Sequence, residues 1–259
     1  MLFDKHIHEK ELKLRILVTN TCNKNCSFCL NDFQKKEQIT FIDLNIVKSC
    51  ISYYAELFKE KYPLQVYFSG GEPTLHKDLI NMMKFAKSLE CNVTLNTNGN
   101  FSEDLEENLI KYSDNIHFGT YSINKKHAEK VKRMNGTIQC IFPFIDESFI
   151  DFYLSYKLHV KIFNDFNSNN SIEYINFMKK IVNKFNSNLL SFRHTGIQEN
   201  RGFGCEDCKK KCITLKAIWL FPDNRISSCP QLFKHQLIYP KTKNEWISYL
   251  KSIEIFHKT

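Results

Sequence analysis

The chain has 259 residues, of which 42% are hydrophobic and 14% aromatic, so it can bury one substantial core. Its formal charge of +8 is spread over short clusters such as Lys209-Lys210-Lys211, which is typical of a solvated surface, so nucleic-acid binding is not expected. No apolar run reaches the roughly 18 residues of a membrane span and the start lacks a signal peptide, so we expect a cytoplasmic protein with no membrane partner.

Short apolar runs of β type alternate with amphipathic patterns from Leu12 to about Thr195. Seven strands are predicted, at Leu14–Asn20, Leu64–Ser69, Asn92–Thr97, Ile116–Ser122, Ile138–Phe144, His159–Phe163 and Leu189–Thr195. Four helices are predicted, at the apolar stripes Leu44–Leu57 and Ile172–Phe185, at Asp78–Glu90, and at Ser102–Tyr112 with Ser102 as the N-cap. Strands separated by helices pair in parallel through right-handed crossovers, so the pattern predicts an α/β fold, either a βα barrel or an open doubly wound sheet.

Ten cysteines are present, and three of them directly follow the first predicted strand. In a chain without an export signal, so many cysteines favour reduced thiols on metal over a disulfide framework. Cys22, Cys26 and Cys29 form a C-x3-C-x2-C array at the carboxyl end of the strand, where ligand sites of parallel α/β folds lie. Four-iron clusters are normally held by four thiolates, so a set of three leaves one iron open for a ligand. A zinc site or three unrelated thiols would also fit the array.

The array resembles the signature of the radical S-adenosylmethionine (SAM) superfamily. This resemblance implies a 4Fe-4S cluster on Cys22, Cys26 and Cys29, whose open iron binds the amino and carboxylate groups of SAM. It implies that an electron from the cluster cleaves SAM to a 5′-deoxyadenosyl radical. It also implies a partial (β/α)6 TIM-type barrel over residues 1–195. The residue before the third cysteine usually packs on the adenine in this family, which assigns Phe28 that role, unless Phe28 is a core aromatic.

The second predicted strand ends in Gly70-Gly71-Glu72-Pro73. Paired glycines let the backbone approach a ligand, and a neighbouring carboxylate can accept hydrogen bonds from an amine. A plain strand-to-helix turn would give the same four residues. In the radical SAM superfamily a glycine-rich motif at this place contacts the amino end of SAM, so the resemblance assigns Gly70, Gly71, Glu72 and Pro73 to SAM binding.

Polar residues also end the next two predicted strands. Such side chains are well placed to bind the ribose hydroxyls and carboxylate of SAM, and family members have a similar pattern at the same strands. The resemblance therefore assigns Asn96, Asn98 and Ser122 to SAM. Asn98-Gly99 is also an ordinary turn dipeptide.

Four more cysteines, Cys205, Cys208, Cys212 and Cys229, form a C-x2-C-x3-C-x16-C group. Four thiolates can hold a cubane or a tetrahedral zinc ion, but zinc ribbons usually have two C-x2-C pairs, so an iron–sulfur cluster is favoured. The stretch from Ile213 to Cys229 reads as a β-hairpin. This region resembles the Twitch extension of radical SAM enzymes, a shortened relative of the SPASM domain. The resemblance implies a small domain over residues 196–259 with a second, auxiliary 4Fe-4S cluster.

Three cysteines remain. Cys50 lies in an apolar stripe and Cys91 at a strand entrance, so both are expected to be structural. Cys140 lies within the fifth strand, where it is either a buried thiol or a hydrogen-atom donor to a substrate radical.

These features lead to a functional hypothesis of a radical SAM oxidoreductase or maturase that abstracts a substrate hydrogen atom. The substrate is expected to be a ribosomal peptide or a natural-product precursor, with the auxiliary cluster as electron acceptor or relay and flavodoxin or ferredoxin as reductant. Two alternatives stay open: a dehydrogenase or epimerase of a small sugar, aminocyclitol or nucleotide, and a non-catalytic zinc-binding protein.

Overall fold

The protein is described by a computed structural model, which covers residues 12–27, 29, 39–164, 171–193, 217–227 and 240–258. In this part of the chain nine strands form one sheet, in the order β7-β6-β5-β4-β3-β2-β1-β8-β9. The strands are β1 (Lys13–Leu17), β2 (Gln65–Ser69), β3 (Asn92–Thr97), β4 (Asn115–Gly119), β5 (Thr137–Phe142), β6 (His159–Asn164), β7 (Leu190–Arg193), β8 (Ala217–Leu220) and β9 (Ile226–Ser227). The helices are α1 (Leu44–Phe58), α2 (Leu79–Ser88), α3 (Glu106–Tyr112), α4 (Lys125–Arg133), α5 (Glu147–Ser155), α6 (Ser171–Phe185) and α7 (Lys243–Lys258), with 3₁₀ turns η2 (Pro73–Leu75) and η3 (Glu103–Leu105).

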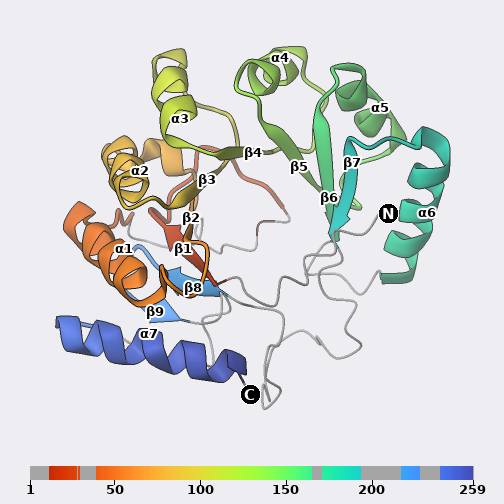
Figure 1. Cartoon of the computed structure of the whole chain (residues 1–259). Coiled ribbons are helices and arrows are strands. Elements are labelled where there is room, and N and C mark those ends of the chain that lie inside the picture. The colour runs from red at the N-terminus through yellow and green to blue at the C-terminus, as the bar shows by residue number, and fades with distance from the viewer. Residues whose placement is uncertain are drawn as a thin grey trace.

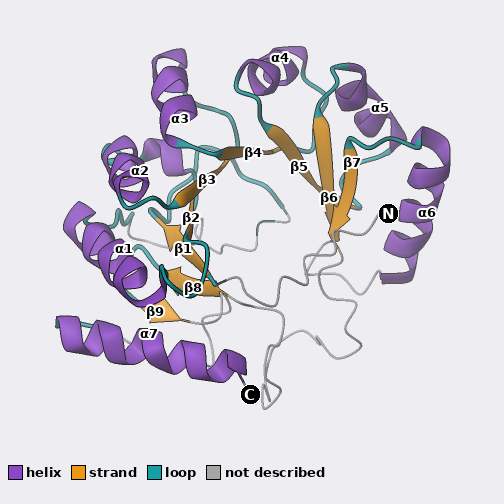
Figure 2. Cartoon of the chain, in the orientation of Figure 1, coloured by secondary structure: helices purple, strands orange, loops and turns teal. Residues whose placement is uncertain are grey.

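From β2 to β7, each strand pairs in parallel with the one before it in the chain. Figure 1 shows them as an arc, with helices α1 to α6 along its outer side. The same layering is clear in Figure 2, where purple helices lie along the outer side of the orange strands. The expected α/β fold with a parallel sheet, matching a partial TIM-type barrel, is therefore confirmed.

The two faces of the sheet differ in polarity, which explains why these segments are strands. In β1, Leu14 and Ile16 are fully buried whereas Lys13 and Arg15 are half-buried. Successive side chains of a strand point to opposite faces, so the apolar set faces the helices and the polar set faces the concave side of the arc. The core lies between sheet and helices, where α1 contributes Val47, Cys50, Ile51 and Tyr54 of its predicted apolar stripe and also Phe58.

Two strands from the carboxyl-terminal part of the chain extend the sheet beyond β1. Strand β8 pairs in parallel with β1, and β9 returns antiparallel to β8, so the predicted hairpin is present within the described residues 217–227. Helix α7 packs on α1, where Trp246 lies 6.3 Å from the ring of Tyr53 and Lys243 pairs with Glu56 at 3.0 Å. No helix of the described residues is long and apolar enough to cross a bilayer.

The seven predicted strands are all present; β3 has the predicted ends, and the ends of the other six are shifted. Strand β1 ends at Leu17 and β4 ends at Gly119, three residues before the predicted ends at Asn20 and Ser122. Four predicted helices correspond to α1, α2, α3 and α6, although Ser102 bonds the Asp104 carboxylate rather than capping a backbone N–H.

Helices α4, α5 and α7 were not predicted from the sequence. In α4 the apolar face is narrow, since its buried residues are Ala128 and Val131. A face of two small residues gives almost no periodic signal among seven polar ones.

Cys140 is placed differently from the hydrogen-donor hypothesis. It is 2% exposed, shares the helix-covered face of β5 with Ile138, and lies close enough to Tyr153 of α5 and Tyr174 of α6 to influence their pKa values. Its thiol therefore faces the core, away from the concave side, which argues against a role as hydrogen-atom donor. Cys50 and Cys91 are buried as expected.

Tyr54 provides a test of how the core is tied to the sheet. Its buried hydroxyl donates to the Leu12 carbonyl and accepts from the Gln65 N–H at 3.2 Å, which joins α1 to the entries of β1 and β2. We expect Tyr54→Phe to lower the free energy of unfolding in urea by about 1–3 kcal/mol, because two backbone groups lose their partner.

Tyr62→Phe is the matched control, because the half-buried Tyr62 hydroxyl has no hydrogen-bond partner among the described residues. Equal losses of stability in the two variants would contradict this role of Tyr54.

Candidate functional site

The loop that carries the cysteines leaves the carboxyl end of β1 and lies against the loop after β2. Three backbone hydrogen bonds join the two segments, from Val18 N to Ser69 O at 2.9 Å, from Gly71 N to Thr19 O at 2.8 Å, and from Glu72 N to Thr21 O at 2.8 Å. Residues 19–21 therefore run along the Gly70–Pro73 loop, and the structure brings together the two motifs that the sequence singled out.

The two glycines are required by this contact between backbones. A Cβ atom on Gly71 would lie 1.8 Å from the Thr21 carbonyl oxygen, and one on Gly70 would lie 2.5 Å from the Thr19 carbonyl oxygen. Gly70 also has a φ of +139°, which L side chains rarely adopt. The sequence predicted a close approach to a ligand; the structure shows a close approach to the cysteine loop itself.

Glu72 is fully buried, and its carboxylate is engaged by protein groups. One oxygen accepts from the Thr74 N–H at 3.1 Å and from the hydroxyls of Thr74 and Thr97, both at 2.7 Å. The other oxygen accepts from the Asn98 N–H at 2.7 Å. The Glu72 carboxylate therefore ties the loop after β2 to the loop after β3. Pro73 begins the η2 turn that Glu72 caps.

The loop after β3 in turn contacts the cysteine loop. The Asn98 amide donates to the Asn23 side-chain oxygen at 2.8 Å and to the Cys22 sulfur at 3.6 Å. Lys24 donates from its ammonium to the Asn98 carbonyl at 3.0 Å, and Asn23 donates to the Asn100 carbonyl at 2.7 Å. Three loops, after β1, β2 and β3, thus form one closed set of contacts.

The other predicted SAM ligands lie farther along the same edge. Asn96 is on the concave face of β3, where its oxygen lies 3.1 Å from Nδ1 of His117. Ser122 is exposed beyond the end of β4, and its carbonyl accepts from the buried Tyr153 hydroxyl at 2.9 Å. Phe28 and the second cysteine group, Cys205, Cys208, Cys212 and Cys229, lie outside the described residues.

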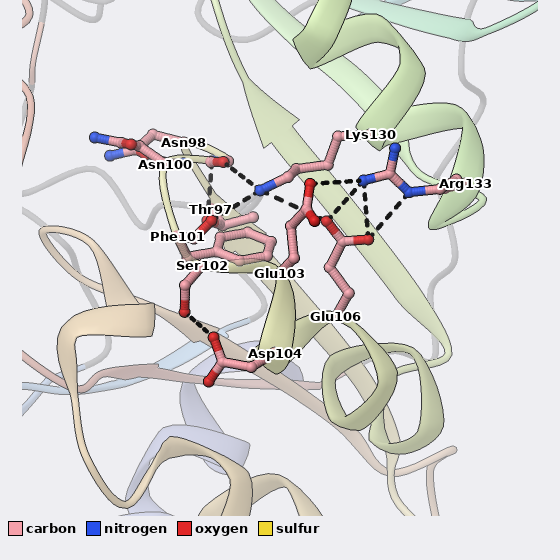
Figure 3. Close-up of polar contacts among 11 residues, drawn as sticks. Thr97, Asn98, Asn100, Phe101, Ser102, Glu103, Asp104, Glu106, Lys130 and Arg133 are labelled. Carbon is pink, nitrogen blue, oxygen red and sulfur yellow. Dashed lines mark hydrogen bonds and ion pairs between the residues drawn. The ribbon is translucent and has the colours of Figure 1, made fainter.

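Helix α4 holds the loop after β3 from its outer side (Figure 3). The Lys130 ammonium, only 14% exposed, donates to the carbonyls of Gly99 at 3.4 Å and Phe101 at 2.8 Å, and lies 4.2 Å from the Phe101 ring centre. Glu106 accepts from Arg133 at 2.9 Å and lies 3.7 Å from Lys130. Burial, with the positive charges of Lys24 and Lys130, lowers the pKa of His127 to about 4, so a neutral imidazole packs against Gly99.

Tyr121 is a site residue that the sequence did not single out. Its hydroxyl bonds the Cys26 thiol, so the loop after β4 also reaches the cysteine loop. Partial burial raises the pKa of Cys26, while the Tyr121 hydroxyl and the charge of Lys24 act in the opposite direction. The negative charge of a Cys26 thiolate raises the pKa of Tyr121. The sequence could have indicated Tyr121 through its position at a strand end, next to Ser122.

The chemistry of the three thiols fits an iron–sulfur cluster. Among the described residues no three Cys, His, Asp or Glu side chains are already arranged around a common metal position. Cys22 and Cys26 are nevertheless half-exposed and Cys29 is exposed, all on one loop, and the Cys22 sulfur accepts from the Lys24 N–H at 3.4 Å as well as from Asn98. Burial instead raises the thiol pKa of Cys91 to about 11, which disfavours the thiolate that binds metal.

Comparison with known proteins identifies the family. Residues 16–147, just over half of the chain, match the model of the radical SAM superfamily, and this range contains the cysteine loop and the loops after β2, β3 and β4. The chain belongs to the radical SAM superfamily. Members of this superfamily are enzymes that use a 4Fe-4S cluster and SAM.

Curated relatives share modest identity over part of their length. The GTP 3′,8-cyclase of Vibrio atlanticus (strain LGP32) is 25% identical over 187 residues, which are 68% of this chain and 53% of that protein. The GTP 3′,8-cyclase of Clostridium perfringens (strain SM101) is 25% identical over 179 residues, 64% of this chain and 51% of the relative. This chain spans about half the length of the curated relatives it matches.

Solved structures share the fold at low identity. Streptococcus suis SuiB bound to S-adenosylmethionine superposes with a TM-score of 0.69 at 14% identity, covering 94% of this chain and 68% of SuiB. Native anSMEcpe with bound AdoMet gives a TM-score of 0.69 at 15% identity and covers 96% of this chain and 83% of that protein. BtrN in complex with AdoMet and 2-DOIA gives a TM-score of 0.54 at 14% identity and covers 95% of this chain and 85% of BtrN.

Substitution of Gly71 tests the loop contact. We expect Gly71→Ala to lower the free energy of unfolding by about 1–3 kcal/mol, because its methyl group overlaps the Thr21 carbonyl and the cysteine loop must move. The amount of iron bound by Gly71→Ala after anaerobic reconstitution should also be lower than in the wild type.

Gly119→Ala is the matched control at the end of β4. The nearest atom to a Cβ there is the Thr97 oxygen at 3.7 Å, an ordinary contact, so iron content and stability should stay close to those of the wild type. Full iron binding and unchanged stability in Gly71→Ala would show that the close approach is not needed.

Proposed function

We propose that Cys22, Cys26 and Cys29 hold a 4Fe-4S cluster whose fourth iron binds SAM, and that the enzyme acts on a peptide or natural-product precursor. The observation that carries this proposal is the closed contact of three loops, after β1, β2 and β3, at the carboxyl ends of the parallel strands. When bound, the two cofactors supply an electron and a 5′-deoxyadenosyl radical that abstracts a hydrogen atom. The residues of the chain bind and orient these groups.

The proposed roles of the motif residues follow from their contacts. Gly70 and Gly71 let the loop after β2 lie along the cysteine loop, and Glu72 and Pro73 fix its shape. The half-buried backbone of Gly71 is then proposed to contact the amino end of SAM.

Asn96, on the concave face, and Ser122, beyond β4, are proposed to bind the ribose hydroxyls and carboxylate of SAM. Phe28 is proposed to pack on the adenine. Asn98 has its amide on Cys22 and Asn23, so we assign it to the cluster side of the site rather than to the ribose.

A peptide substrate is supported by similarity of fold. SuiB has been solved bound to its precursor peptide SuiA, and that structure matches 92% of this chain with a TM-score of 0.68 at 16% identity. The second candidate is a reaction on a small molecule, such as its oxidation or epimerisation. The name of the curated relatives, GTP 3′,8-cyclase, favours a nucleotide as that small molecule, and the BtrN complex with 2-DOIA also favours a small-molecule substrate. On the concave face, the Arg15 guanidinium between the rings of Tyr67 and Trp219, at 4.6 and 5.2 Å, also favours a polar or anionic substrate group. Flavodoxin or ferredoxin is the proposed reductant.

Reductive cleavage of SAM tests the proposed activity. The anaerobically reconstituted wild type, reduced with dithionite, is expected to form 5′-deoxyadenosine, measured by liquid chromatography and mass spectrometry. Cys22→Ala should abolish it, because the cluster loses one of three ligands. Cys91→Ala, at the opposite end of the strands, should retain it. A wild type that binds iron and never yields 5′-deoxyadenosine would contradict the proposal.

Deuterium transfer distinguishes the substrate classes. Deuterated peptides, GTP and an aminocyclitol are incubated separately with the holoenzyme, and deuterium in 5′-deoxyadenosine is measured. Transfer from a peptide supports the first candidate, and transfer from small molecules alone would replace it with the second.

A second, auxiliary 4Fe-4S cluster is proposed on Cys205, Cys208, Cys212 and Cys229. Its support is the sequence pattern together with the β8–β9 hairpin, which directly precedes Cys229 in the chain and is attached to β1. The cluster would accept or relay an electron.

Cys229→Ala should lower bound iron by about half, because each cubane holds four irons. The absorbance and EPR signal of the first cluster should be retained in Cys229→Ala. In the control variant Cys91→Ala the iron content should equal that of the wild type. Unchanged iron in Cys229→Ala would rule out this assignment.

A further inference from the structure

The side chain of Asn98 lies between the loop after β3 and the sulfur of Cys22. Its amide nitrogen is 3.6 Å from that sulfur and 2.8 Å from the Asn23 oxygen, so the two N–H groups have separate acceptors on the cysteine loop. The Lys24 backbone N–H, at 3.4 Å, is the second donor to the same sulfur. Among the three cysteines of the loop, Cys22 therefore has a backbone donor and a side-chain donor from another loop.

Asn98 is fixed in the orientation that presents its amide nitrogen to Cys22. Its side-chain oxygen accepts from the Asn100 N–H at 2.8 Å, so the nitrogen is the end directed at the sulfur. Its own N–H donates to the buried Glu72 carboxylate at 2.7 Å, and its carbonyl accepts from Lys24 at 3.0 Å. These three contacts set the backbone and the amide plane of Asn98.

The loop behind Asn98 is held on its other side as well. Lys130 reaches from α4 towards this loop, as Figure 3 shows, and donates to the carbonyls of Gly99 and Phe101. The Thr97 hydroxyl accepts from the Gly99 N–H at 3.1 Å. A donor on a loop fixed from both sides loses little conformational entropy when it bonds a ligand atom.

We infer that Asn98 is a positioning residue that hydrogen-bonds the cluster through the Cys22 sulfur and raises the reduction potential of the cluster. Reduction adds an electron to the cluster, part of whose charge lies on the thiolate sulfurs, and a hydrogen bond stabilises the more negative state. Asn98 would therefore ease the electron uptake that precedes SAM cleavage. The inference rests on the proposed cluster at Cys22, Cys26 and Cys29.

The test is an EPR-monitored redox titration of the reconstituted holoenzyme without SAM. The comparison is made at the solution potential that half-reduces the first cluster of the wild type. At this potential we expect the ratio of reduced to oxidised first cluster in Asn98→Ala to be roughly three- to tenfold lower, because the cluster has lost one hydrogen bond. Asn98→Asp keeps the shape and the acceptor for Asn100 but lacks the donor, and its carboxylate adds negative charge, so its ratio should fall at least as far.

Asn100→Ala is the matched control in the same loop. The exposed Asn100 side chain makes no hydrogen bond among the described residues, so this variant should titrate like the wild type. Potentials are compared in proteins of equal iron content, which separates loss of the donor from loss of the cluster.

The outcomes separate this inference from the proposed function. If both Asn98 variants hold a full first cluster that titrates like that of Asn100→Ala, the hydrogen bond does not act on the cluster and the inference is wrong. If the wild type forms no cluster on Cys22, Cys26 and Cys29, the proposed function fails instead.

Discussion

The close approach of the Gly71 backbone to Thr21 is the contact on which the site depends. A single methyl group at Gly71 would come within 1.8 Å of a carbonyl oxygen, so the backbone of the loop after β2 can lie along the cysteine loop only with glycine at this position. Two hydrogen bonds of 2.8 Å between the loops follow from that approach. They fix the path of the chain between β1 and the first cysteine.

The carboxylate of Glu72 extends this contact to a third loop. It is buried beside the glycines, where an unpartnered carboxylate would be very unfavourable, and it is paired with donors from Thr74, Thr97 and Asn98. Asn98 then returns to Cys22, and Lys130 secures the loop from α4. Moving any one of the three loops breaks hydrogen bonds in the other two, which suits a site that must hold a cluster and a cofactor in fixed relation.

The sheet was largely predictable from the sequence because its signal is local. The alternation of Leu14 and Ile16 with Lys13 and Arg15 marks a strand with one helix-covered face, and similar runs mark the other six strands of the arc. Helix α4 escaped prediction because two small residues, Ala128 and Val131, form its buried face.

The role of Glu72 could not be predicted, because its donors on Thr97 and Asn98 lie 25 and 26 residues away and meet it only through the register of β2 and β3. The same is true of Asn98 and Cys22, which are 76 residues apart. Sequence motifs located the site, whereas the side-chain contacts within it depend on how neighbouring strands align.

The family establishes the use of a cluster and SAM, and the packing of the three loops is our account of how this chain would hold them together. The most direct test is the EPR spectrum of the dithionite-reduced, reconstituted protein recorded before and after addition of saturating SAM. The account predicts that SAM changes the g-values of the reduced cluster, because SAM binds the iron that Cys22, Cys26 and Cys29 leave open. A reduced cluster whose spectrum is the same with and without SAM would contradict it.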